Sequence, residues 1–143
     1  MTGGARTVFL GCLCAAMVLT ASASSAEWRF EFLGSSETPL SNPHDVKLSK
    51  DGEVLFVSDV GSGRVVGLDA DTLGFVDAFG VDILSGPHDL DLDESGKMYV
   101  ADTHNGRAAI FAMQGLRGEL VGSLSDRISG PEGILVHPNG MIY

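Results

Sequence analysis

The sequence is poor in cysteine and in positive charge, and each shortage excludes a class of function. Its 143 residues include two cysteines, Cys12 and Cys14, both near the N-terminus. Nine lysines and arginines stand against 19 aspartates and glutamates, for a formal net charge of −10. A protein that binds nucleic acid needs a basic face for phosphate contacts, so this charge balance excludes nucleic acid as a partner.

The sequence also lacks a hydrophobic run long enough to cross a membrane as a helix. The longest run covers residues 7–19, which is short of the ~20 residues that a spanning helix requires. Arg6 precedes it and small residues at 21–26 follow it, as in a secretory signal with its cleavage site. We predict a signal peptide at 1–26 and a secreted or periplasmic mature chain without a membrane span. A lipoprotein site at Cys12 is a weaker alternative.

Several catalytic signatures are missing from the mature sequence. Cleavage of the signal removes both cysteines, which excludes thiol catalysis. The remaining residues contain neither a Gly-x-Ser-x-Gly nucleophile elbow nor a phosphate-binding loop. Hydrophobic residues nevertheless make up 44% of the chain, which is enough to form a folded core.

Glycine is abundant, and its distribution points to strands. The 19 glycines are about twice the usual number, and no segment after the signal has a helical period. Short segments rich in Val, Ile and Phe alternate with Gly-containing turns, a pattern typical of hairpin-linked antiparallel strands. We therefore predict an all-β protein with strands at 44–48, 54–58, 64–68, 75–79, 89–92, 97–101, 107–111 and 116–121.

An internal repeat of about 44 residues organises the chain. The tetrapeptide Pro-His-Asp-Val at 43–46 returns as Pro-His-Asp-Leu at 87–90 and as Pro-Glu-Gly-Ile at 131–134. Four short strands in each unit of this length are what one blade of a β-propeller requires. The repeat predicts units at 43–86 and 87–130 and an incomplete unit at 131–143.

This repeat resembles the NHL repeat. The resemblance lies in Pro-x-x-Val/Leu/Ile, a following x-Gly turn, Val-x-Asp, and a Gly-rich turn before Arg. The segment Asp-Thr-His-Asn-Gly-Arg at 102–107 is close to that family's consensus, and 59–64 is a looser copy. NHL propellers usually have six blades. The resemblance thus implies a six-bladed-type β-propeller, of which this chain would form about two and a half blades.

The ends of the repeat region suggest an open structure. Residues 27–33 alternate apolar and charged side chains, so we predict that 27–42 form an outer strand and a linker. In closed propellers such a strand commonly completes the last blade. Two and a half blades cannot close a ring, because propellers typically need four to eight. We expect the chain to be an N-terminal fragment of a longer protein; the alternative is that several copies assemble into a ring.

The strongest candidate ligands are His44 and His88, which occupy the same place in successive units. Histidine is the commonest metal ligand, and Glu132 holds the equivalent place in the third unit. The arrangement resembles the lyase propeller of peptidylglycine amidating enzymes, which implies zinc at His44 and His88; Glu132 departs from that pattern. A role for both histidines in strand packing remains open. A weaker possibility is calcium at three aspartates on one strand face, Asp89, Asp91 and Asp93.

Two Asp–Arg pairs are predicted to be structural. Asp59 and Asp102 end the second strand of their units, where a carboxylate accepts backbone N–H groups, and Arg64 and Arg107 open the third strand beside them. The two other histidines, His104 and His137, are expected to be ordinary surface residues.

Taken together, these patterns favour a binding scaffold over an enzyme. We expect an exported propeller that binds an unidentified protein or small-molecule ligand. The alternative is a metal-dependent lyase or hydrolase that uses the two histidines.

Overall fold

The structure is a computed structural model that describes residues 29–32 and 34–143. The chain divides into two units, 1–32 and 33–143. In the first unit, residues 29–32 form no strand, and Phe30 and Phe32 are exposed. The predicted signal peptide lies outside the described residues. The outer strand expected at 27–33 stays a prediction. The blade that it would complete needs strands beyond those described.

The second unit contains two four-stranded antiparallel sheets. Sheet A has the order β1-β2-β3-β4, and sheet B has the order β5-β6-β7-β8. The strands of sheet A are β1 (Pro43–Leu48), β2 (Val54–Asp59), β3 (Arg64–Asp69) and β4 (Phe75–Phe79). Those of sheet B are β5 (Pro87–Leu92), β6 (Met98–Asp102), β7 (Arg107–Gln114) and β8 (Arg117–Leu124). The predicted all-β fold is confirmed at this level.

Helical structure in the described residues is limited to two single turns. These are η1 (Val60–Ser62) and η2 (Thr103–Asn105), each between the second and third strands of its sheet. Among the described residues, no helix combines the length and the apolar character needed to cross a bilayer.

The last hairpin of sheet B is longer than predicted. We expected its strands to end at 111 and 121, but the ladder continues to the pair Gln114↔Arg117 and to Leu124. A tight turn makes this extension possible, because Gly115 adopts a left-handed backbone with φ of 62°. The turn lies where the glycine predicted one.

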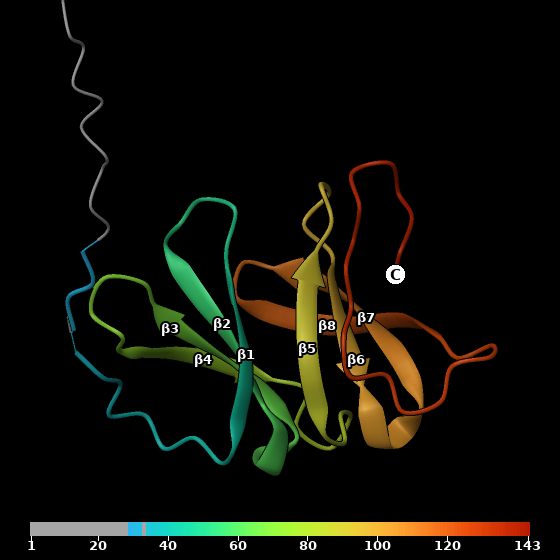
Figure 1. Cartoon of the computed structure of the whole chain (residues 1–143), viewed down its shortest axis with the longest axis horizontal. Helices are drawn as coiled ribbons and strands as arrows, with labels where there is room; N and C mark the ends of the chain where they lie inside the picture. The colour runs from blue at the N-terminus through green and yellow to red at the C-terminus, as the bar shows by residue number, and fades with distance from the viewer. Residues whose placement is uncertain (1–28, 33) are drawn as a thin grey trace, which may run out of the picture. The chain divides into compact units, whose positions relative to one another are not determined.

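The main core lies between the two sheets. Side chains from β2, β3 and β4 pack against side chains from β5, β6 and β7, and the rings of Phe79 and Phe111 meet edge to face at 5.2 Å. Because the sheets share this core, β1 and β5 lie side by side (Figure 1).

The segment after sheet B begins a third copy of the repeat. Val136 and Ile142 form an antiparallel bridge, and Leu135 and Tyr143 exchange two backbone hydrogen bonds of 2.9 Å each. This two-stranded ribbon starts at the third copy of the Pro-x-x-apolar motif. It has the same order of elements as the starts of sheets A and B.

Candidate functional site

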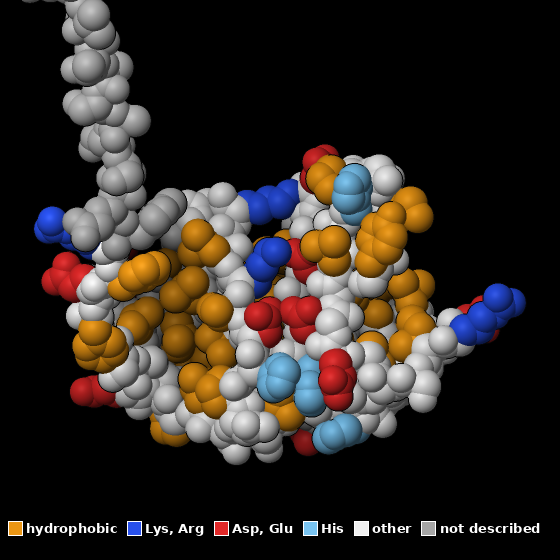
Figure 2. Space-filling model, in the orientation of Figure 1, with side chains coloured by type: hydrophobic (Ala, Val, Ile, Leu, Met, Phe, Trp, Pro, Cys, Tyr) orange, Lys and Arg blue, Asp and Glu red, His pale blue; other side chains and the backbone are white. Residues whose placement is uncertain are grey.

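Equivalent side chains of the first two repeats face each other across β1 and β5. Three pairs meet there: His44 with His88, Asp45 with Asp89, and Lys47 with Asp91. We term these six residues the inter-sheet column. Imidazole, acidic and basic side chains gather over β1 and β5, flanked by apolar surface (Figure 2).

A β-bulge at the start of each first strand produces this alignment. The register of β1 against β2 shifts between Pro43 and Val46. His44 and Asp45 therefore share a single opposite residue, Ser58, and β5 repeats the shift at the equivalent place. A bulge interrupts the alternation of side chains, so the histidine and the aspartate both reach the neighbouring first strand.

The buried hydroxyl of Ser58 closes the bulge and joins the two sheets. Its oxygen accepts the N–H of Asp45 at 2.8 Å, and its O–H donates to the carbonyl of His88 at 2.9 Å. Thr103, in η2, donates a hydrogen bond to the carbonyl of Pro131 at 2.6 Å. A hydroxyl group of each of the first two repeats thus binds the start of the following repeat.

The two histidine rings are in contact. Their centroids are 4.4 Å apart with an angle of 41° between the ring planes. His44 is exposed and His88 is half-buried. The buried Nδ1 of His88 has no hydrogen-bond partner among the described residues. A buried nitrogen without a partner is unfavourable, so the position of the His88 ring has a cost in free energy.

Below the histidines, the carboxyl groups of Asp45 and Asp89 share a hydrogen bond. Burial raises the pKa of Asp89, and the bond to Asp45 raises it further. The backbone N–H groups of Ile134 and Leu90, each 2.7 Å from a carboxyl oxygen of Asp89, oppose this rise only in part. One carboxyl of the pair therefore keeps its proton at a higher pH than an ordinary aspartate does.

Lys47 and Asp91 form the charged end of the column. The ammonium nitrogen lies 2.6 Å from one carboxyl oxygen of Asp91, and the other oxygen accepts the N–H of Val136 at 2.7 Å. Burial favours the neutral acid, but the ion pair and the backbone N–H groups outweigh it and lower the pKa of Asp91. Asp91 therefore connects all three repeats.

The predicted structural pairs each join the end of a second strand to the start of the third strand. Arg64 Nε is 2.9 Å from Asp59, and Arg107 Nε is 2.7 Å from Asp102. Each buried carboxylate also accepts the backbone N–H of the residue two positions before the first strand of its own sheet, Ser41 or Ser85. These bonds fix the entry of the chain into that sheet.

The third predicted metal ligand, Glu132, is not grouped with the two histidines in the described residues. Within 29–32 and 34–143, no three His, Cys, Asp or Glu side chains are arranged to hold a metal ion. Glu132 is exposed and joins no such group with His44 and His88. Zinc binding by the histidines stays a prediction.

The three aspartates considered for calcium have separate contacts. Asp89 and Asp91 hold the backbone of the third unit, whereas Asp93 caps its own turn through the N–H groups of Ser95 and Lys97. Burial opposes ionisation of Asp93, but its hydrogen bonds with Ser95, Lys97 and Tyr99 outweigh it and lower its pKa.

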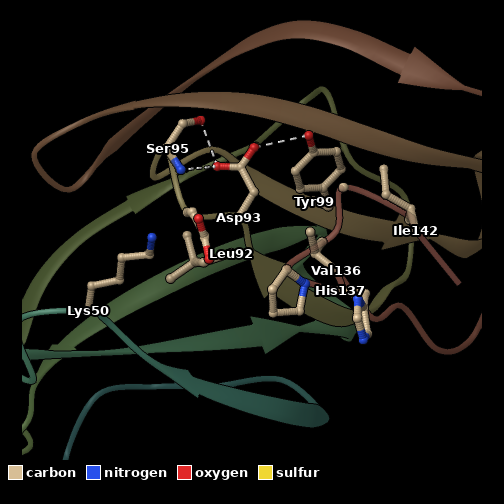
Figure 3. Close-up of a pocket in the computed structure, with 11 residues that line it drawn as sticks. Lys50, Leu92, Asp93, Ser95, Tyr99, Val136, His137 and Ile142 are labelled. Carbon is tan, nitrogen blue, oxygen red and sulfur yellow. Dashed lines mark hydrogen bonds between the residues drawn. The ribbon is translucent and has the colours of Figure 1, made fainter.

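A pocket lies where turns of the three repeats meet, apart from the column. This pocket of about 290 Å³ is lined by Lys50, Tyr99 and His137 among others (Figure 3). The hydroxyl of Tyr99 donates to Asp93 at 3.2 Å. The Nδ1 of His137 accepts the N–H of Asn139 at 3.2 Å, so this histidine caps its turn and also lines the pocket.

Sequence reasoning missed two of the six residues of the column and the serine that links its two strands. Asp45, Lys47 and Ser58 were not singled out, although Asp45 and Lys47 stand 44 residues before Asp89 and Asp91. Applying the repeat interval to every polar residue of the first strand would have paired them. The repeat could not point to Ser58 in the same way, because the equivalent residue in sheet B is Ala101, which has no hydroxyl group.

Comparison with known proteins identifies the fold but no family. No protein-family model matches the chain, and no curated protein matches it in sequence. Solved structures do match it in fold, among them the following three. Hydrazine synthase of Kuenenia stuttgartiensis is 22% identical with a TM-score of 0.60, over 78% of this chain and 31% of that one.

The other two structures agree with this result. A putative 6-phosphogluconolactonase from Bacteroides uniformis ATCC 8492 is 21% identical with a TM-score of 0.57, over 68% of this chain and 31% of that one. A luciferin-regenerating enzyme is 20% identical with a TM-score of 0.57, over 73% and 36%. The chain spans about a third of the length of each structure. Its described residues thus have a β-propeller-like all-β fold.

Proposed function

We propose that the chain is an NHL-type β-propeller module, exported from the cell, that binds a protein or small-molecule ligand at the inter-sheet column. The 44-residue repeat and the two four-stranded sheets support the propeller architecture. The positive residue, apolar run and small residues within 1–26 support export.

The observation that carries this proposal is the column itself. It places imidazole, carboxyl and ammonium groups within one short stretch of two adjacent strands, and apolar side chains surround it. Donors and acceptors fixed by secondary structure are preorganised, so ordering them when a ligand binds costs little conformational entropy.

A titration followed by nuclear magnetic resonance tests this placement. Monosaccharides, amino acids and short lysine-containing peptides are added separately to the ¹⁵N-labelled chain. We expect at least one probe to shift the amides of 44–47 and 88–91, and His88→Ala to remove the shifts. Shifts confined to other residues in every titration would contradict a ligand site at the column.

The second candidate is a metal-dependent lyase or hydrolase, and the histidine contact favours it. Two imidazoles with centroids 4.4 Å apart are suitable zinc ligands, and zinc would supply Lewis-acid chemistry there. Adding Zn²⁺ to the same titration separates the candidates. Stoichiometric zinc binding that is lost in His44→Ala and His88→Ala, but kept in the control His104→Ala, would favour the enzyme over the scaffold.

A further inference from the structure

A second pocket lies between sheets A and B, where the chain leaves β1 and β5 beyond the Lys47–Asp91 pair. It has a volume of about 260 Å³ and is lined by the turns after β1 and β5 and by the hairpin of β7 and β8. All of its lining residues lie within 49–116, so its walls belong to the two four-stranded sheets and their turns. We term it the inter-sheet pocket.

The interior of this pocket is apolar. Val54 and Phe56 of sheet A are buried in the main core, and three partly buried side chains of sheet B pack against that core, namely Leu92, Met113 and Leu116. Because these three are only partly buried, they present apolar surface to the pocket. The flexible side chain of Met113 can adapt to the shape of an apolar group. The interior therefore suits an apolar group better than a polar one.

The wall formed by the β7–β8 hairpin has no counterpart in sheet A. Met113 and Leu116 correspond to Ala70 and Leu73, 43 residues earlier in the chain. In sheet A this segment is a turn, which the carboxyl group of Asp69 holds through backbone N–H groups. In sheet B the two strands continue through the segment. The wall is thus a feature of one repeat and is not required by the repeat fold.

The rim of the pocket carries an ammonium group and a carboxylate in different states. The carboxyl group of Asp51 accepts the hydroxyl of Ser49 at 2.6 Å and the backbone N–H of Glu53 at 3.1 Å, and these bonds lower its pKa. Asp51 is therefore ionised and bonded within its own turn. Lys50, in contrast, has no carboxylate within 4.0 Å among the described residues, so its ammonium group is available to an anion.

We propose that the inter-sheet pocket binds a small carboxylic acid, with its apolar body against Leu92, Met113 and Leu116 and its carboxylate on the ammonium group of Lys50. The volume is below the ~300–1,000 Å³ of sites for drug-sized ligands, which restricts the occupant to a smaller molecule. The column contributes no residue to this pocket. The proposal therefore does not rest on ligand binding at the column, and either one can fail alone.

A titration of the ¹⁵N-labelled chain with 3-phenylpropanoate and with hexanoate, followed by nuclear magnetic resonance, tests the proposal. We expect both acids to shift the amides of 49–56, 92–96 and 113–116, with a Kd of about 1 mM. The uncharged 3-phenylpropanol should bind about fivefold more weakly than the acid. Lys50→Gln should weaken binding of the acids about fivefold and leave binding of the alcohol unchanged. The matched control is Lys97→Gln, since Lys97 is exposed next to the equivalent turn and should not affect binding.

Leu116→Ser tests the apolar part of the site and should weaken binding of the acid and of the alcohol alike. Unchanged amide signals outside the pocket verify that each variant keeps its fold. The absence of shifts with either acid up to about 10 mM overturns the proposal. Shifts confined to 136–142 overturn it too, because they would place the acids in the neighbouring pocket that Lys50 also lines (Figure 3). Wild-type affinity of Lys50→Gln for the acids overturns it as well.

Discussion

At the scale of single residues, the carboxyl groups have the most distinct roles. Asp59 and Asp102 are fully buried and pair with arginines, whereas Asp91 pairs with Lys47 from the other sheet. Asp89 instead meets a second acid, Asp45. Residue type alone does not separate these roles; the neighbouring charge and the backbone N–H groups do.

Removing one buried carboxylate should destabilise the protein strongly. Asp102→Ala deletes the partner of Arg107 and the acceptor of the Ser85 N–H, and we expect a loss of about 3 kcal/mol in the free energy of unfolding. Urea denaturation measures it. The exposed Asp126→Ala serves as the control, with a change within about 0.5 kcal/mol. Equal stability of the two variants would contradict the structural role of Asp102.

The acid pair should make stability depend on pH in a defined direction. Because the pKa of Asp89 is raised in the folded state, its contribution is present at low pH and is lost as the pH rises through that pKa. In Asp45→Asn the amide donates to Asp89 without needing a shared proton. We expect the free energy of unfolding of the variant, relative to that of the wild type, to rise by about 1 kcal/mol between pH 4 and pH 7.

Thermal unfolding at several pH values measures this gain. Asp126→Asn, which changes an exposed carboxyl far from a second acid, should follow the wild-type profile throughout. Parallel profiles for Asp45→Asn and the wild type would show that the two carboxyls do not share a proton.

At the scale of elements, the two repeats use the same turn in different surroundings. Gly63 and Gly106 end η1 and η2 in the left-handed conformation, with φ of 59° and 62°. A Cβ at Gly63 would lie 2.9 Å from the carbonyl oxygen of Leu84, whereas one at Gly106 would have its nearest neighbour at 3.9 Å, the carbonyl oxygen of Ile128. The first turn is enclosed and the second is open.

Alanine substitutions should reveal this difference. We expect Gly106→Ala to cost about 1 kcal/mol for the left-handed backbone alone, and Gly63→Ala to cost about 2–3 kcal/mol because the carbonyl must also move. Chemical denaturation of both variants provides a matched comparison. A larger loss for Gly106→Ala would contradict the described packing of η1.

The length of the strands shows how far local pattern predicts an element. The first strand pair of sheet A was predicted to within one residue, since apolar alternation ends at clear Gly-containing turns. The hairpin of β7 and β8 extends further, because Met113 and Leu116 pack on the core despite the glycine between them. Packing across the two strands, and not the local sequence pattern, determines where β7 ends and β8 begins.

At the scale of the whole molecule, the inter-sheet core explains the position of the site. Packing of sheet A on sheet B aligns β1 with β5, and this alignment creates the column. The other face of sheet A has its own smaller core, in which Val57, Val66 and Leu68 are buried and Leu40 packs against them.

The sequence by itself determined the all-β class and the equivalence of positions 44 residues apart, because strand alternation and glycine turns are local properties of the chain. It also determined which residues could meet, such as His44 with His88. Only the tertiary structure decided that they do meet and that Asp45 and Lys47 join them. Those outcomes depend on how one sheet packs on the next. Such packing is set by contacts between side chains distant in sequence, which no local pattern contains.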